Sequence, residues 1–466
     1  MKDLFKLQEN KTDRGREMLA GLTTFLAMAY ILAVNPGILS AAGMPKGGVF
    51  FATALASFVG TALMALFANY PFALAPGMGL NAYFAYTVVL GMGYSWQFAL
   101  LAVFVEGLIF LLLSLTKVRE SIFNCIPLTL KTAVSVGIGL FIAFIAMQNA
   151  HIIVDAPTLV GFQSFSKSNI TGHGICAILA IVGTLITAWG LHKNIRGSIL
   201  FGILITWILG MLAQLVGLYV VDPEIGCFSL FPSFSIKTFT NSYSEFTEVF
   251  GALFKSSAWT LRDAEATGFS LLGSANFVII MFAFMFVDIF DTMGTLIGVS
   301  TKADMLDKDG KLPRISGALL SDSIATSIGA IFGTSTVTTF VESASGVAEG
   351  GRTGLTAMTT AFLFLLSLLF APIFLAIPGF ATAPALIIVG FYMISGVTKI
   401  DFGNYLDAIP AYLTILIMPF AYSISEGICA GVISWTVLNF FSPRRKDINP
   451  LMYVLTVLFL SKYVLL

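Results

Sequence analysis

The sequence predicts an all-α polytopic membrane protein of about fourteen transmembrane segments, arranged as two inverted repeats of seven. Its composition is 57% hydrophobic and only 11% charged, whereas a soluble domain has about 45–50% and 25%. Apolar runs near the roughly 20 residues that span a bilayer recur along the whole chain. In each half, one such run is interrupted by residues that break helices. Paired broken helices in matching places are typical of transport proteins.

The expected spans follow the apolar runs in chain order. They lie at about 18–39, 49–70, 80–93, 97–116, 126–149, 172–191, 197–220, 276–299, 315–333, 353–376, 380–397, 408–424 and 426–442, with a half-helix at 341–351. We therefore divide the chain into a first repeat (1–220), an extracytoplasmic connecting loop (221–275), a second repeat (276–443) and a tail (444–466). The apolar end of the tail, Leu451 to Leu466, is shorter than a span and is expected to lie at the membrane interface.

Basic residues predict the orientation of the chain in a plasma or inner membrane. They cluster before the first span, from Lys2 to Arg16, and in a subset of later connections that ends with Arg444 to Lys446. Because cytoplasmic loops are enriched in Lys and Arg, both termini are expected in the cytoplasm, which requires an even number of spans.

Two polar stretches interrupt the hydrophobic segments that we number 3 and 10. The first runs from Ala75 to Tyr83 and contains Pro76, two glycines and Asn81; the second runs from Thr334 to Ser343. The β-branched residues of the second stretch predict a short strand, which inside a membrane needs a partner strand. We expect that partner around Met78 to Leu80, so that two antiparallel strands meet at the midplane, each followed by a half-helix.

Carboxylates inside predicted spans are the next strongest signal, because an aspartate at a helix centre costs about 2.5–3.5 kcal/mol. Asp288 and Asp291 are three residues apart and share a helix face, and Glu342 directly follows the second strand. We interpret these three as functional. For Glu106 and Asp322, a structural tie between helices and a role in proton relay are both left open.

A buried carboxylate can hold a proton near neutral pH and can also bind a solute, which couples the two ligands. A planar heterocycle with adjacent donors and acceptors suits a lining of carboxylates and an asparagine. Aromatic side chains could sandwich such a ring, although ordinary helix packing is the better explanation for any single one of them. The aromatic candidates are Phe25, Tyr30, Phe84, Phe286 and Phe340.

Other classes of protein fit the pattern less well. The four cysteines and three histidines show no metal-ligand or redox spacing, and no cofactor, enzyme activity or nucleic-acid partner is expected. An anion carrier of the same fold would want a basic residue at the site rather than carboxylates. A membrane protease would place two aspartates on different helices. A membrane sensor that binds the same solute without moving it stays open.

The chain resembles the AzgA-like hypoxanthine, adenine and guanine permeases of the nucleobase–ascorbate transporter superfamily almost from end to end. The matching stretches are Gly21 to Phe25 with Tyr30-Ile31 and Val34-Asn35-Pro36, then Ala75 to Tyr83, Gly137 to Phe144 with Gln148-Asn149, Val287 to Gly298, and Ser321 to Thr356. The resemblance implies a core domain of segments 1–4 and 8–11 that moves against a gate domain of segments 5–7 and 12–14, often in a dimer. It implies import of guanine, hypoxanthine or adenine by proton symport, with a carrier of pyrimidines or anions and a purine sensor as alternatives.

The resemblance also assigns roles to individual residues. The purine-binding residues of the family fall on Asn81, Asp288 and Glu342, and a second aspartate tied to transport falls on Asp291. We add Phe340 and Thr24 to the expected substrate site, and we group Asp291, Glu342 and Glu106 as the expected proton-coupling residues. The histidine found in the uracil and xanthine branches has no counterpart here.

Overall fold

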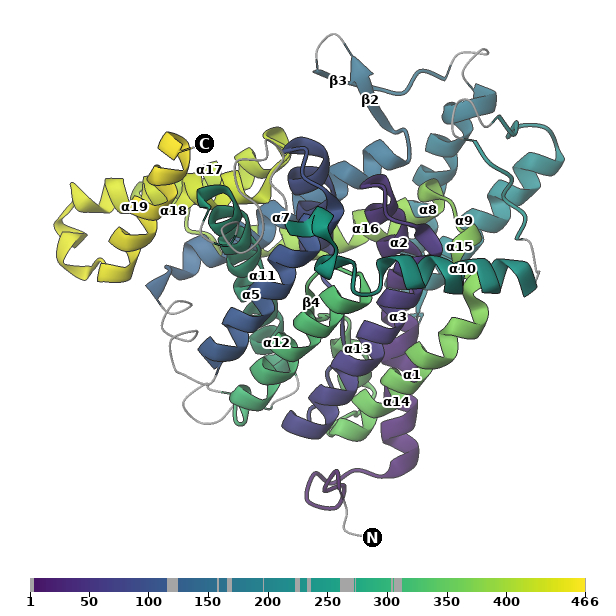
Figure 1. Cartoon of the computed structure of the whole chain (residues 1–466), viewed down its shortest axis with the longest axis horizontal. Coiled ribbons are helices and arrows are strands. Elements are labelled where there is room, and N and C mark those ends of the chain that lie inside the picture. The colour runs from purple at the N-terminus through teal and green to yellow at the C-terminus, as the bar shows by residue number, and fades with distance from the viewer. Residues whose placement is uncertain are drawn as a thin grey trace.

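Helices make up most of the chain in the computed structural model (Figure 1). It describes residues 4–114, 125–156, 159–165, 170–195, 197–222, 227–232, 236–259, 272, 274–302, 305 and 312–465. Among these residues, nine helical stretches are long and apolar enough to cross a membrane. Three shorter apolar helices and the two broken segments complete the fourteen segments expected from the sequence.

The first half contains the seven expected segments in the order predicted. Its elements are α1 (Arg14–Met28), α2 (Ile31–Ala41), α3 (Lys46–Leu63), η1 (Met64–Ala68), β1 (Leu74–Pro76), α4 (Met78–Ala82), η2 (Tyr83–Gly91), α5 (Trp96–Ser114), α7 (Leu128–Asn149), β2 (Ile153–Ala156), β3 (Leu159–Phe162), η3 (Ile170–Gly174), α8 (Ile175–His192) and α9 (Ser198–Leu215). The β2–β3 hairpin was not expected from the sequence.

The second half repeats this plan after a connecting region. Its elements are α10 (Ile236–Val249), η5 (Ala252–Phe254), η6 (Ser256–Trp259), α11 (Ala275–Lys302), α12 (Ile315–Phe332), β4 (Val337–Thr339), α13 (Ser343–Ala348), α14 (Gly354–Ser367), η8 (Leu368–Phe370), α15 (Ala371–Ala376), α16 (Gly379–Ile394), η9 (Ser395–Lys399), α17 (Tyr405–Phe420), α18 (Ile424–Phe440), η10 (Pro443–Asp447) and α19 (Pro450–Leu465).

The two broken segments meet as an antiparallel pair of three-residue strands. Leu74 is opposite Thr339, and Pro76 is opposite Val337. The prediction of a strand pair is confirmed, but its expected position at Met78 to Leu80 is wrong. Those residues begin α4: the Gly77 amide donates to the carbonyl of Thr336 beyond the last strand pair, and Gly77 is also the N-cap of the helix.

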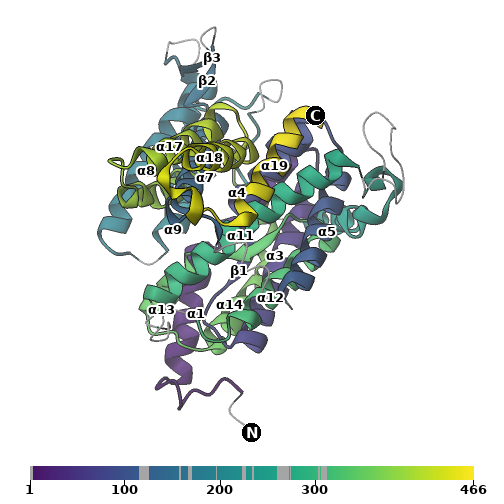
Figure 2. The same cartoon turned by 90° about the vertical axis from the view of Figure 1, so that its left-hand side faces the viewer.

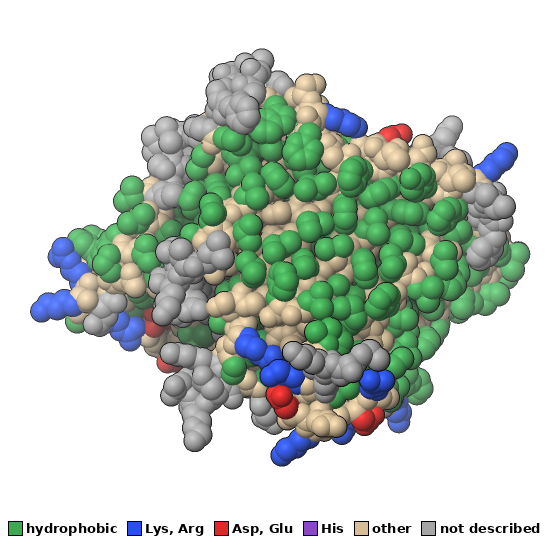
Figure 3. All heavy atoms as spheres, turned by 60° about the horizontal axis from the view of Figure 1, so that its bottom comes forward, with side chains coloured by type: hydrophobic (Ala, Val, Ile, Leu, Met, Phe, Trp, Pro, Cys, Tyr) green, Lys and Arg blue, Asp and Glu red, His purple; other side chains and the backbone are tan. Residues whose placement is uncertain are grey.

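The helices form two bundles, which are separate in the view of Figure 2. In the first bundle α14 packs on α1 and α3, and α12 packs on α3 and α5. In the second, α16 packs on α7 and α8, and α17 packs on α7 and α18. These groups correspond to the expected core and gate domains. Figure 3 shows a broad apolar surface with charged side chains gathered toward its edges, as a bilayer-facing protein requires.

The connecting region is more ordered than a simple loop. Helix α10 lies against α3, and the Glu245 carboxylate accepts hydrogen bonds from the amides of Gly47 (2.7 Å) and Gly48 (3.3 Å) at the start of α3. Farther along, the Gly251 amide donates to the carbonyl of Ile331 at the end of α12 (2.7 Å). This region therefore fastens the ends of two spans of the first bundle to each other.

Candidate substrate-binding site at the broken helices

A row of hydroxyl side chains, which we call the hydroxyl row, runs along the second broken segment. It consists of Thr334, Ser335, Thr336 and Thr338, and all four are buried. Successive side chains of an extended chain point in opposite directions, so this segment can contact several helices at once. The row thereby contacts four different spans of the first bundle.

Two members of the hydroxyl row contact residues predicted to act in binding and coupling. Ser335 donates to the side-chain oxygen of Asn81, which is fully buried in the first turn of α4. Thr338 donates to Asp291 on α11 across 3.1 Å. The strand pair therefore holds Asn81 and Asp291 on the two sides of one short segment.

The other two members tie the row to α2 and α5. The Asn35 side-chain amide donates to Thr334 (2.9 Å), and Thr336 donates to the fully buried Glu106 (2.9 Å). Glu106 thus contacts the site from the α5 side. Both readings given to Glu106, a helix tie and a proton relay, are compatible with this position.

Glu342 lies at the start of α13 and is partly exposed. The Tyr30 hydroxyl donates to its carboxylate across 2.6 Å. Glu342 and Asp291 are close enough to interact electrostatically, and Tyr392 of the second bundle also interacts with Glu342. Glu342 is therefore the predicted site residue that faces the other bundle.

Asp288 occupies a different, fully buried position one turn from Asp291. The Thr292 hydroxyl lies 2.8 Å from one oxygen of Asp288 and 2.9 Å from one oxygen of Asp322 on α12. Both aspartates are 0% exposed. The single hydrogen of the Thr292 hydroxyl is therefore within donating distance of both carboxyl groups.

Phe340 and Thr24 are both buried close to the break. The Phe340 amide donates to the carbonyl of Ala73 and extends the strand ladder. Thr24 donates to the carbonyl of Ala20 and lies against Gly346 of α13. Thr24 therefore borders the helix that follows Glu342.

Most of the other aromatic candidates pack on rings of the protein itself. The pairs are Phe25 with Phe364 at 5.3 Å, Phe84 with Phe284 at 6.4 Å, and Phe286 with Phe459 at 5.4 Å between ring centroids. Tyr30, by contrast, uses its hydroxyl on Glu342. Tyr30 is the aromatic candidate with a polar contact to a predicted site residue.

Sequence reasoning missed the buried carboxylate of Glu17, which ties α1 to the start of α14. Glu17 is 0% exposed and accepts from the amides of Arg352 (2.9 Å) and Thr353 (3.2 Å) and from the hydroxyls of Thr353 (2.8 Å) and Thr356 (2.7 Å). It therefore caps the start of α14. In the sequence, Glu17 adjoins a basic cluster and so gave no sign of being buried.

The described residues contain no group of three or more His, Cys, Asp or Glu side chains placed to hold a metal ion. The site around the strand pair is built instead from amide, hydroxyl and carboxylate groups. Such groups can donate to and accept from an uncharged, hydrogen-bonding solute.

A family profile described as "Permease family" matches residues 15–429. The chain belongs to this permease family. The match confirms the resemblance to the nucleobase–ascorbate transporter superfamily, and it identifies the chain as a transporter rather than an enzyme.

Curated relatives match over nearly their whole length. The chain is 42% identical to "Guanine/hypoxanthine permease PbuG" of Bacillus subtilis, covering 100% of both chains. It is 39% identical to "Adenine permease AdeP" of Escherichia coli, covering 99% of this permease and 95% of that one.

Among solved structures, the transmembrane domain of the cyanobacterial bicarbonate transporter BicA superposes with a TM-score of 0.58 at 17% identity. The match covers 90% of this permease and 97% of that domain. It confirms the fold class. Together these matches make the chain a multi-pass membrane permease.

Proposed function

We propose that this permease imports purine nucleobases by proton symport, with the two bundles moving relative to each other so that the site opens alternately to each side. Guanine and hypoxanthine are the favoured substrates and adenine is a third. The names of the relatives support the substrate class. The proton is the only coupling partner, and no other cofactor takes part.

The chemistry around the strand pair supports a neutral heterocycle as the solute. Asn81 offers both a donor and an acceptor, and Glu342 offers carboxylate oxygens that accept from ring N–H groups. An anion is a poorer fit, because Glu342 and Asp291 would repel it. The shared fold with a bicarbonate transporter therefore does not extend to its solute.

The single observation that carries proton coupling is the position of Thr292 between two buried carboxyl groups. Both carboxyl groups are fully buried and share one hydroxyl, and two adjacent buried negative charges repel each other, so this pair is suited to hold a proton at membrane depth. Asp291 lies one helical turn from Asp288 and contacts the hydroxyl row. A proton at this pair is thus linked through α11 to the expected substrate site.

Uptake of radiolabelled hypoxanthine tests the proposal in cells that lack their own purine permeases. Unlabelled guanine and adenine should compete, uracil should not, and a protonophore should abolish accumulation. Binding of purine by the purified protein without any uptake would instead indicate a sensor. The absence of both uptake and binding would reject purines as the substrate class.

Replacing Thr292 with valine tests the coupling site separately. Thr292→Val keeps the side-chain volume but removes the shared hydroxyl, and the loss of one hydrogen bond to a charged group predicts roughly tenfold lower uptake. Thr292→Ser should retain most of the activity. Thr295→Val, one turn farther along the same helix, is the control. If uptake by Thr292→Val and by the unmodified protein had the same pH profile, the proposal that the coupling proton binds beside Thr292 would be rejected.

A further inference from the structure

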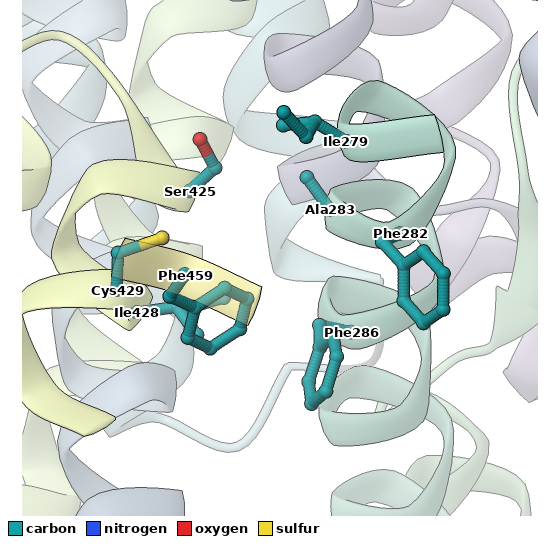
Figure 4. Close-up of a pocket in the computed structure, with 8 residues that line it drawn as sticks. All are labelled: Ile279, Phe282, Ala283, Phe286, Ser425, Ile428, Cys429 and Phe459. Atoms are coloured by element: carbon teal, nitrogen blue, oxygen red, sulfur yellow. The ribbon is translucent and has the colours of Figure 1, made fainter. Parts of the chain in front are cut away.

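An apolar pocket opens between α11, α18 and α19, away from the strand pair (Figure 4). It holds about 350 Å³ of empty space, part of which is open to the surroundings. Its lining residues are Ile279, Phe282, Ala283, Phe286, Ser425, Ile428, Cys429 and Phe459. Ordered water in a cavity needs two to four polar partners, whereas the polar side chains of this lining are one hydroxyl, of Ser425, and one weakly polar thiol, of Cys429. The pocket suits a hydrocarbon.

The pocket joins the two bundles and the C-terminal helix. Phe286 comes from α11 of the first bundle, Ile428 comes from α18 of the second, and Phe459 comes from α19. The rings of Phe286 and Phe459 meet edge to face at 5.4 Å. Phe286 is two residues before Asp288 on the same helix, so an occupant would contact the helix that carries the expected site.

Helix α19 has the surface of a helix immersed in lipid. One face, with Met452, Leu455 and Phe459, is buried. The opposite face exposes apolar side chains, with Val454 at 58% and Val457 at 67%. Exposed apolar residues at helical spacing contact hydrocarbon in a membrane protein. The pocket is therefore bordered by lipid acyl chains rather than by water.

Three basic residues occupy the turn that joins α18 to α19. Arg444, Arg445 and Lys446 are all exposed in η10. Arg444 pairs with Asp407 at 2.9 Å, whereas Arg445 lies over the ring of Phe440. Basic clusters next to a membrane helix attract anionic lipid headgroups, and the positive-inside rule places this turn at the cytoplasmic leaflet.

The spacing between turn and pocket matches one leaflet. Ile428 is twelve residues before Phe440 and Phe459 is nine residues after Pro450, which at 1.5 Å per residue are about 18 and 14 Å of helix. Half of a hydrocarbon core of about 30 Å is about 15 Å. A lipid whose headgroup contacts the basic turn therefore reaches the pocket with the end of its acyl chain.

We propose that the α11–α18–α19 pocket binds one acyl chain of an anionic phospholipid whose headgroup lies at Arg445 and Lys446. The lipid bridges the α18–α19 hairpin to α11 and so contacts both bundles. Binding of this lipid does not depend on the proposed transport activity.

Native mass spectrometry of the purified full-length protein measures the bound lipid directly. With dioleoyl phosphatidylglycerol added, one lipid should remain bound, and dioleoyl phosphatidylcholine should bind roughly tenfold less. Dihexanoyl phosphatidylglycerol has the same headgroup but chains too short to reach Phe459, so it should also bind at least roughly tenfold less. Equal binding of the short-chain and long-chain lipids would overturn the role of the pocket.

Two matched pairs of variants locate the lipid. Ala283→Phe fills the pocket and should lower occupancy, whereas Val457→Phe on the exposed face of α19 should not. The double change Arg445→Gln and Lys446→Gln should reduce phosphatidylglycerol binding to the level of phosphatidylcholine, whereas Lys399→Gln in η9 should leave it unchanged. Full occupancy in both Ala283→Phe and the double variant would place the lipid elsewhere and reject the proposal.

Discussion

Threonine hydroxyls contact several carboxylates in the spans of this permease. The Thr336 hydroxyl donates to Glu106, and the Thr338 hydroxyl donates to Asp291. The Thr292 hydroxyl lies within hydrogen-bond distance of both Asp288 and Asp322. A hydroxyl can donate to an ionised carboxylate and can accept from a protonated one by rotating its hydrogen. Such contacts persist when a proton arrives or leaves. An arginine partner, which can only donate, would hold the carboxylate in its ionised form.

Glu342→Gln tests the carboxylate that faces the second bundle. Glutamine keeps the size and the contact with Tyr30 but cannot accept N–H groups on both oxygens or exchange a proton. Uptake should fall roughly 10- to 100-fold, as expected for a lost charge-assisted hydrogen bond, while the amount of protein in the membrane stays the same. Glu349→Gln, at the other end of α13, is the control. If Glu342→Gln takes up purine as fast as the unmodified protein, Glu342 does not bind the substrate or the coupling proton.

His151, which lies outside the spans, should make the stability of the protein depend measurably on pH. Its ring stacks on His173 at 3.7 Å, and burial together with the charge of His173 lowers the pKa of His151 from 6.5 to about 4. Between these two values the unfolded chain binds more protons than the folded one, so stability falls as pH falls from 6.5 toward 4.

His151→Asn should therefore reduce the loss of melting temperature that accompanies acidification from about pH 7 to about pH 5. Asparagine tolerates the left-handed backbone of this position, where φ is 56°. The exposed His192→Asn is the comparison. If both variants lose as much melting temperature on acidification as the unmodified protein, His151 does not stay neutral in the folded state.

The elements follow from the sequence where a local pattern decides them. Length and apolar content predicted the long spans, and Pro76 with its glycines predicted the first break. The position of β1 was missed because its residues Leu74 and Ala75 carry no strand signal apart from their partner. The partners of Thr336 and Thr338 lie 230 and 47 residues away. No local pattern encodes contacts over such distances.

Glu17→Ala tests how strongly α14 depends on its carboxylate cap. The change leaves the buried amide and hydroxyl of Thr353 without their acceptor. Each unsatisfied buried group costs about 1–3 kcal/mol, so the melting temperature in detergent should drop clearly. Glu9→Ala removes only an exposed pair with Lys6 and should cost less than about 1 kcal/mol. Equal melting temperatures for the two variants would contradict the cap.

At the scale of the whole molecule, the two bundles come very close beside the first break. A Cβ on Gly79 would lie 2.9 Å from Ile138 of α7 and 3.7 Å from Ile424 of α18. Only a glycine allows this approach without moving the neighbouring helix. Any relative movement of the bundles must change this contact.

Cysteines at both positions test that movement. In a background without the four natural cysteines, Gly79→Cys combined with Ile138→Cys should form a disulfide when treated with an oxidant, because a Cβ at position 79 lies next to the side chain of residue 138. Cross-linked protein should lose uptake, and dithiothreitol should restore it. The two single variants control for the substitutions. Undiminished uptake in fully cross-linked protein would show that the bundles do not separate here.

The pairing of β1 with β4 also has a consequence for synthesis of the chain, because β1 is made long before β4. Pro76 is opposite Val337, so the first break enters the membrane long before its partner exists. At about 5–20 residues per second, the ribosome needs roughly 10 to 50 s to make the intervening chain. During that time the free backbone groups of the first break have no strand partner in a medium that offers no water. A ribosome that stops before the second break therefore leaves in the membrane a half-protein that its own sequence cannot complete, and the cell's insertion machinery must shelter or remove it.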